Sequence, residues 1–213
     1  MQEKKLAIII PAFNEEKTIE SVICDLKNFG NVIVIDDCST DNTYKVSNKQ
    51  NITVIKNNKN FGYDGAIYEG IKYSIRKGYD ICCTFDADAQ HSSEDLKEMI
   101  KMFKYKKIDL LIGNRPKSQR LMESFFNLHL KRRENINDIF CGLKIYSKKL
   151  CKEYLDEFKY NNFGTKVALK AIRAGAKFEQ FDVKVFDRKD SPRVKSLFIN
   201  LKIFIALMRD IFR

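Results

Sequence analysis

Short apolar runs alternate with helical patterns along the chain, and this alternation constrains the fold more than any other feature. Residues 6–10 form a continuous apolar run rich in β-branched residues, as in a strand buried on both faces. Residues 19–26 follow with apolar side chains spaced i, i+3, i+4 and i+7, the period of an amphipathic helix. Strands that alternate with helices of this length build parallel βαβ units. We therefore predict an α/β fold with a mostly parallel, Rossmann-like sheet and helices on both faces.

The same patterns predict the remaining elements. Asn14 is the candidate N-cap of the first helix, and Ser92 or Ser93 that of a later one. Further strands are expected at residues 32–35, 52–55, 79–85, 110–112, 139–146 and 177–186. Further helices are expected at residues 63–77, 92–103, 121–137, 164–174 and 197–213.

Size and cysteine usage indicate one intracellular domain. The 213 residues, 44% of them hydrophobic, suit a single core. We divide the chain into a domain at residues 1–195 and a C-terminal amphipathic helix at 196–213. The opening MQEKKLAIII lacks the long apolar region and small-residue cleavage site of a signal peptide. The six cysteines show no CxxC spacing, so we expect reduced thiols in a cytoplasmic protein and no zinc site.

Three polar clusters follow three of the predicted strands. PAFNEE begins at Pro11, DDCSTD begins at Asp36, and DADAQH begins at Asp86. Ligands of parallel α/β sheets bind outside the carboxyl ends of the strands, which is where all three clusters fall. Asp36 and Asp37 stand where an acidic residue meets the sugar or base of a nucleotide in such folds. A turn held by local bonds to Ser39 and Thr40 is the alternative.

No glycine-rich phosphate cradle is present. The loop after the first strand has neither G-x-G-x-x-G nor G-x-x-x-x-G-K, so a bound pyrophosphate needs another source of positive charge. A divalent cation held by carboxylates is the obvious one. In extended backbone, Asp86, Asp88 and Gln90 would point to one side and could face one Mg²⁺ or Mn²⁺. Acidic residues at a helix start are the structural alternative.

The motifs together resemble a known family. PAFNEE, IDDCSTDNT, NKNFGYDGAIYEGI and FDADAQHSSEDL, in this order and spacing, resemble family 2 glycosyltransferases with the GT-A fold. Within that family the chain is similar to the dolichyl or polyprenyl phosphate mannosyl- and glucosyltransferases. The likeness is strong over residues 6–120. It continues more weakly through GNR at 113–115, DIFCGLKIYS at 138–147 and FDRKDSPR at 186–193.

The resemblance implies the reaction and the roles of individual residues. It implies an inverting transfer of a hexose from a GDP- or UDP-linked donor, with Mg²⁺ or Mn²⁺ as a Lewis acid. The metal would be held by Asp88 and Gln90. His91 has two candidate roles, a contact with a phosphate or a cap of the next helix. Donor contacts are implied for Pro11, Ala12, Phe13, Glu15, Asp36, Asp37 and Asp86.

The resemblance also implies the acceptor, a polyprenyl or dolichyl phosphate. Arg115 and Arg188 match family arginines that contact phosphates, and a guanidinium can hold a phosphate bidentately. Because a lipid phosphate is already ionised, it needs no general base. The alternative acceptor is a sugar hydroxyl in capsule, lipopolysaccharide or other glycan assembly. That reaction needs a base, for which Asp138 is the candidate, unless Asp138 only orients its loop.

Charge and the C-terminal pattern bear on partners. The formal net charge is +11, which fits either a lysine-rich solvated surface or binding to an anionic membrane or a phosphate-bearing substrate. No nucleic-acid-binding motif is present, so we expect no nucleic acid partner. The final helix is apolar over most of its circumference but carries charges that disfavour spanning. We expect it to lie at the cytoplasmic face of a membrane, or to pack on the core or on a second subunit in a homodimer.

The sequence bears on two other function classes. A nucleotidyltransferase would need a glycine-rich basic loop after the first strand, which the sequence lacks. A basic, membrane-associated binding protein that has lost the reaction would not need the intact pair Asp86 and Asp88. Both classes are therefore less favoured than a glycosyltransferase.

Overall fold

The computed structural model describes residues 5–158, 165–187 and 196–211. In these residues a seven-stranded sheet has the order β3-β2-β1-β4-β6-β5-β7. Its strands are β1 (Leu6–Ala12), β2 (Asn31–Asp36), β3 (Thr53–Lys56), β4 (Ile81–Thr84), β5 (Leu110–Asn114), β6 (Lys144–Ser147) and β7 (Phe178–Asp182). Only β6 is antiparallel to its neighbours β4 and β5; the other pairs are parallel. The predicted mostly parallel sheet is confirmed.

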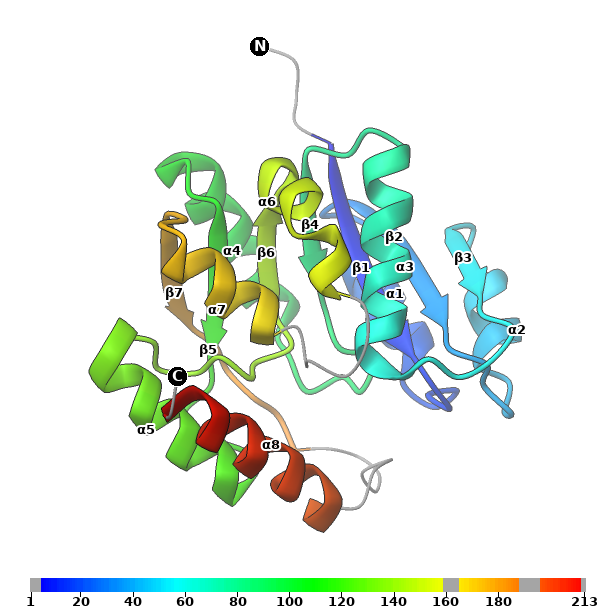
Figure 1. Ribbon diagram of the computed structural model, residues 1–213. Coiled ribbons are helices and arrows are strands. Elements are labelled where there is room, and N and C mark those ends of the chain that lie inside the picture. The colour runs from blue at the N-terminus through cyan, green and yellow to red at the C-terminus, as the bar shows by residue number, and fades with distance from the viewer. Residues whose placement is uncertain (1–4, 159–164, 188–195, 212–213) are drawn as a thin grey trace.

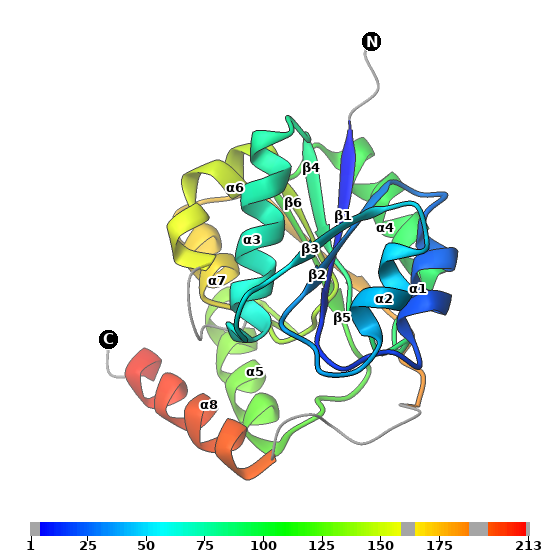
Figure 2. The ribbon, with the colours of Figure 1, turned by 90° about the vertical axis from the view of Figure 1, so that its right-hand side faces the viewer.

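Helices cover both faces of this sheet. Figure 2 shows α3, α6 and α7 on one side and α1, α2 and α4 on the other. Ile9 of β1 packs with Ile67 and Ile71 of α3, whereas Ile8 faces Ile23 of α1. Burial on both faces explains the continuous apolar run. The helices are α1 (Ile19–Leu26), α2 (Thr43–Asn48), α3 (Gly62–Arg76), α4 (Ser93–Lys106), α5 (Leu121–Glu134), α6 (Lys148–Glu153), α7 (Thr165–Arg173) and α8 (Ser196–Ile211), with a 3₁₀ turn, η1 (Leu155–Phe158).

Some local predictions were wrong. Asn14 does not cap α1: its backbone is left-handed at φ 57°, and its side-chain oxygen accepts a hydrogen bond from the Thr40 amide. The strand expected at residues 139–146 begins only at Lys144, because residues 138–142 form a loop. Ser92 does cap α4, through a bond from the Asp95 amide.

Helices α5 and α8 lie side by side below the carboxyl ends of the strands (Figure 1). The backbone amide of Met122 in α5 donates to Asn200 Oδ1 of α8 at 3.3 Å. Ile199, Ile203 and Leu207 of α8 are buried in the core cluster that also contains α3 and α5. Among the described residues, no helix combines the length and apolarity needed to cross a membrane. The division into residues 1–195 and 196–213 stays a prediction.

An ionic network fixes the far end of α8. Asp210 accepts hydrogen bonds from both terminal nitrogens of Arg173 in α7, at 2.6 and 2.8 Å. His129 of α5 lies 3.1 Å from the same carboxylate, and Arg173 also bonds Glu134. The hydrogen bonds from Arg173 are the main reason that the pKa of Asp210 is lowered, despite its burial. Asp210 thus joins α8 to two other helices.

Replacing Asp210 by alanine is expected to lower the free energy of local opening of α8 by about 2 kcal/mol, because a charged hydrogen-bond acceptor is lost. Because the pKa of Asp210 is lowered, this stabilisation is present at neutral pH. It is lost only as the pH falls below the pKa of an unfolded aspartate, about 3.9, and through the lowered pKa of the folded state. Hydrogen exchange should show faster exchange of α8 amides in Asp210→Ala, with β1 and β4 unchanged. Glu98→Ala on exposed α4 is the control, and unchanged protection of α8 would contradict this role.

Candidate active site

A cavity of about 370 Å³ opens where the three polar loops meet. β1 and β2 end side by side, with Ala12 paired to Asp36, and β4 ends next to β1. α3, α5, α8 and the loop 138–142 complete the walls. The cavity therefore gathers eight of the predicted residues: Pro11, Ala12, Phe13, Glu15, Asp37, Asp86, Asp88 and Arg115. Asp36, Gln90 and Asp138 are not part of its described lining, and Arg188 falls outside the described residues.

Asp86 is fixed from three directions. Tyr63 Oη at the start of α3 donates to its Oδ1 at 2.8 Å, and His91 Nε2 lies 3.2 Å from its Oδ2. Gly142 packs against the carboxylate so closely that a Cβ atom there would collide with it. Burial would raise the pKa of Asp86, but the hydrogen bonds of His91 and Tyr63 and nearby positive charge hold the pKa below its ordinary value. A fixed, ionised carboxylate suits contact with a polar ligand.

The segment after Asp86 turns instead of continuing the strand. Residues 87–89 form a turn with Ala89 left-handed at φ 60°, so the extended geometry assumed for Asp86, Asp88 and Gln90 is wrong. Asp88 still lines the cavity, and its Oδ1 accepts the Gln90 amide at 3.2 Å. The Gln90 side chain reaches the Phe186 carbonyl and the side chain of Gln119. The assignment of Asp88 and Gln90 to a metal stays a prediction.

The two aspartates after β2 have different surroundings. Asp37 accepts hydrogen bonds from Asn57 Nδ2 at 2.7 Å and from the amides of Phe61 and Gly62 at 3.0 and 2.7 Å. It therefore fixes the start of α3 beside the cavity. Asp36 is fully buried, and neither of its carboxylate oxygens has a hydrogen-bond partner among the described residues. A buried polar group without a partner is costly, so Asp36 is suited to accept a bond from a ligand or water.

Arg115 and Asp138 form a buried ion pair. Arg115 Nε donates to Asp138 Oδ2 at 2.6 Å and its Nη2 to Oδ1 at 3.0 Å, while Nη2 also reaches Glu123. Asn127 and the Phe140 amide also donate to Asp138 Oδ1. Burial would lower the pKa of Arg115, but its bonds to Asp138 raise it. Both carboxylate oxygens of Asp138, the candidate base, thus accept hydrogen bonds. Arg115, the predicted phosphate-binding residue, already uses Nε and Nη2 in these bonds.

Three further residues contribute to the site: Arg120, one of several basic candidates in the sequence, and two residues to which the sequence analysis gave no role. Arg120 lines the cavity with its side chain a quarter exposed, and its Nη1 bonds Glu123 at 2.6 Å. Lys144, buried in β6, donates to the Cys141 carbonyl and so holds the loop 138–142. Tyr63 stands inside the NKNFGYDGAIYEGI motif, which was noted only as a family signature. The bond between Tyr63 and Asp86 joins segments 23 positions apart, so no local pattern marks it.

The oxygen ligands suit a hard divalent cation. In the described part of the chain, no group of three or more His, Cys, Asp or Glu side chains is arranged to hold a metal. Mg²⁺ is commonly held by only one or two carboxylates, with substrate phosphates and waters as the other ligands. The carboxylate of Asp88 at the cavity therefore fits such a cation when a diphosphate is bound.

Comparison with known proteins agrees with this geometry. The sequence profile described as Glycosyl transferase family 2 matches residues 7–155. A relative in Methanococcus voltae, the UDP-N-acetylglucosamine–dolichyl-phosphate N-acetylglucosaminyltransferase, is 27% identical over 98% of this chain and 96% of its own. The undecaprenyl-phosphate mannosyltransferase of Micrococcus luteus is 23% identical over 87% and 85% of the two chains.

A solved structure shares the fold. The glucosyl-3-phosphoglycerate synthase of Mycobacterium tuberculosis, in complex with Mn²⁺, uridine diphosphate and glucosyl-3-phosphoglycerate, aligns with a TM-score of 0.77. The alignment covers 96% of this chain and 78% of that one, at 17% sequence identity. At this identity the likeness shows the fold alone.

Proposed function

The chain belongs to glycosyl transferase family 2 and has the GT-A fold, and from this premise we propose that it transfers a hexose from a GDP- or UDP-linked donor to a polyprenyl or dolichyl phosphate, with inversion. The observation that carries the proposal is the cavity in which the three polar loops meet and to which Asp86, Asp88 and Arg120 contribute. The named relatives that cover most of this chain use lipid phosphates of this class by their names.

The donor nucleoside would lie against the β1 and β2 loops. Pro11, Ala12 and Phe13 offer an apolar wall, and Glu15 adds a polar group. A contact of Asp36 with the base or ribose stays a prediction, because its buried carboxylate is not part of the described cavity lining. Asp37 would act indirectly, because its oxygens hold the start of α3.

The diphosphate would lie near Asp88 in the cavity, whose lining also includes Arg120. A Mg²⁺ or Mn²⁺ bound with it would act as a Lewis acid and stabilise the negative charge of the leaving nucleoside diphosphate. Asp88 would be its protein ligand, with Gln90 as the second one proposed from the sequence. Asp86, held by Tyr63 and His91, would orient the donor sugar and ribose.

The hydrogen bonds of Asp138 bear on which acceptor the protein would use. A sugar hydroxyl must lose its proton to a base, but the carboxylate of Asp138 is already bonded to Arg115 and Asn127. A lipid phosphate attacks as an anion without a base, so the arrangement favours it. Arg120 would contact the phosphate, and Arg115 would position the loop of Asp138. A role for Arg188 stays a prediction. The acceptor places the reaction at a membrane, which we expect to be its cytoplasmic face.

A transfer assay tests this function. Purified protein should move label from one of a panel of GDP- and UDP-sugars to a short-chain polyprenyl phosphate, with little transfer to free sugars. EDTA or Asp88→Ala should lower the rate by about a hundredfold or more, because charge stabilisation of the leaving group is lost. Asp25→Ala, on the exposed side of α1, is the matched control. Equal rates with EDTA, or preferential transfer to sugar hydroxyls, would contradict the proposal.

A further inference from the structure

Exposed apolar side chains are concentrated on two helices. Ten large apolar side chains are exposed among the described residues, and seven of them lie on α5 and α8. Those of α5 recur at i, i+4 and i+7, and those of α8 follow a similar helical spacing, so each set forms a stripe. The seven residues are Leu121, Phe125, Leu128, Leu201, Phe204, Ile205 and Ile211. We call them the α5–α8 face.

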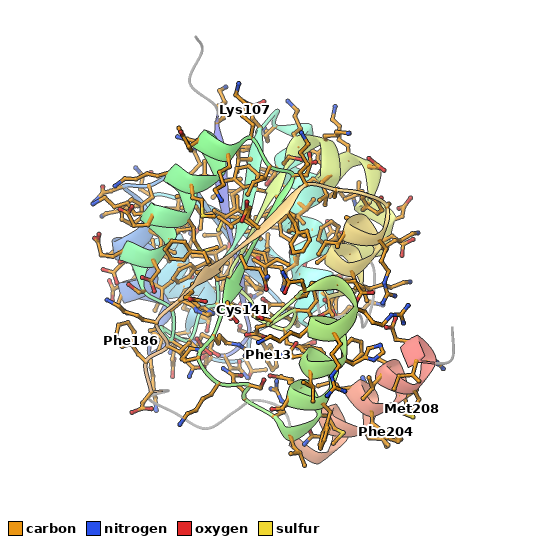
Figure 3. All side chains as sticks on the ribbon, turned by 90° about the vertical axis from the view of Figure 1, so that its left-hand side faces the viewer. Phe13, Lys107, Cys141, Phe186, Phe204 and Met208 are labelled. Atoms are coloured by element: carbon orange, nitrogen blue, oxygen red, sulfur yellow. The ribbon has the colours of Figure 1, made fainter. Side chains whose placement is uncertain are left out.

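The two stripes belong to one layer of the molecule. α5 and α8 adjoin in all three views, and Phe204 and Met208 lie on α8 at the lower edge of Figure 3. Their opposite sides are buried: Phe126 and Leu130 of α5 and Ile203 of α8 pack into the core. The apolar stripes therefore point away from the sheet.

Every exposed charged side chain on these two helices is basic. They are Lys131, Arg132 and Arg133 of α5 and Lys202 and Arg209 of α8. The acidic residues of the two helices are not exposed. Glu123 and Asp210 are buried in ion pairs, and Glu134 bonds Arg173. An apolar stripe bordered by cations is typical of helices that lie in the interface of an anionic membrane.

We propose that the α5–α8 face docks on an anionic lipid surface, with both helices lying along the membrane plane. The charge pattern favours lipid over a second copy of the chain. A two-fold symmetric contact would place the same basic residues of both copies around one apolar patch, without acidic partners. Anionic head groups would instead place negative charge beside these basic residues.

Docking would present the active-site cavity to the lipid. Ile199 and Ile203 of α8 line the cavity, while Phe204 and Ile205 of the same helix face outward. One helix thus forms both the cavity wall and the membrane contact. A lipid phosphate could then reach the cavity while its chain stays in the bilayer. This consequence, unlike the docking itself, rests on the proposed function.

Vesicle sedimentation tests the docking without any donor or acceptor. The full chain should bind vesicles containing phosphatidylglycerol and bind pure phosphatidylcholine much more weakly, with binding reduced by salt. Phe125→Glu and Phe204→Glu should each weaken binding about tenfold or more. Tyr105→Glu is the matched control, because Tyr105 is an 87% exposed aromatic residue on α4, away from the face. Melting curves would confirm that each variant is folded.

A second pair of variants tests the charges. Lys131→Gln with Arg132→Gln should weaken binding to anionic vesicles, whereas Lys101→Gln with Lys104→Gln on α4, with the same change in net charge, should not. Wild-type binding by Phe125→Glu and Phe204→Glu would overturn the proposal. So would light scattering that shows a dimer which these variants dissociate, without vesicle binding. In all of these variants, transfer to a short-chain soluble acceptor should stay at the wild-type rate, whether or not the face binds vesicles. The proposed function is therefore tested separately.

Discussion

Replacing Gly142 by alanine is expected to reduce transfer activity by about a hundredfold or more, because a misplaced active-site group costs that much. The added methyl group would collide with the carboxylate of Asp86. Asp86 would have to turn away, and its bonds to Tyr63 and His91 would break. Steady-state kinetics measure the loss, and a melting curve should show that the variant is folded.

Gly78→Ala is the control for this variant. Gly78 lies beyond the end of α3, with open space around the position of a new Cβ and a left-handed φ of 79°. Alanine there should cost about 1 kcal/mol of stability, through backbone strain, and leave the rate unchanged. Normal activity of Gly142→Ala would show that Asp86 does not need its present position.

Replacing Asp138 by alanine is expected to destabilise the fold by about 3–5 kcal/mol, because it leaves the buried charge of Arg115 without its main partner. For a chain of this size the melting temperature should fall by roughly 10 °C. Asp182→Ala, which removes an exposed carboxylate bonded to Asn114, should change stability by less than about 1 kcal/mol. Thermal unfolding of the two variants gives the comparison.

The same measurement separates two roles for Asp138. If it were a general base, Asp138→Ala would lose activity while its melting temperature stayed near that of the wild type. As a positioning residue it should couple to Arg115. In a double-mutant cycle, Arg115→Met with Asp138→Leu should cost less than the sum of the single changes. Additive losses would contradict a structural ion pair.

The sequence was enough to predict that the three polar loops meet, because a single rule of parallel sheets determines where such loops lie. Loops that follow parallel strands lie at the same sheet edge, so Phe13, Asp37 and Asp88 could be brought together without a structure. The backbone conformation within a loop could not. Next to the turn at Ala89, the side chain of Gln90 contacts Phe186 and Gln119, which lie far along the chain.

The ion pair of Arg115 and Asp138 shows the other limit. The two residues are 23 positions apart. Each stands in a motif that suggests a direct role, a phosphate contact for Arg115 and a general base for Asp138. β6 inserts antiparallel between β4 and β5, which sets the course of the loop that precedes it. A sequence without an alignment gives no sign of that strand order. The contribution of α5 to an apolar face was missed for the same reason, since its partner α8 is distant in sequence.

Calorimetric titration of UDP and GDP tests the central claim most directly, since it needs neither acceptor nor turnover. One of these nucleotides should bind the wild-type protein at least about tenfold more tightly with Mn²⁺ than with EDTA, because Asp88 would hold a cation that neutralises the charge of the diphosphate. That difference should disappear in Asp88→Ala and persist in Asp25→Ala. Equal affinity of the wild type with Mn²⁺ and with EDTA, or full metal dependence in Asp88→Ala, would contradict the account.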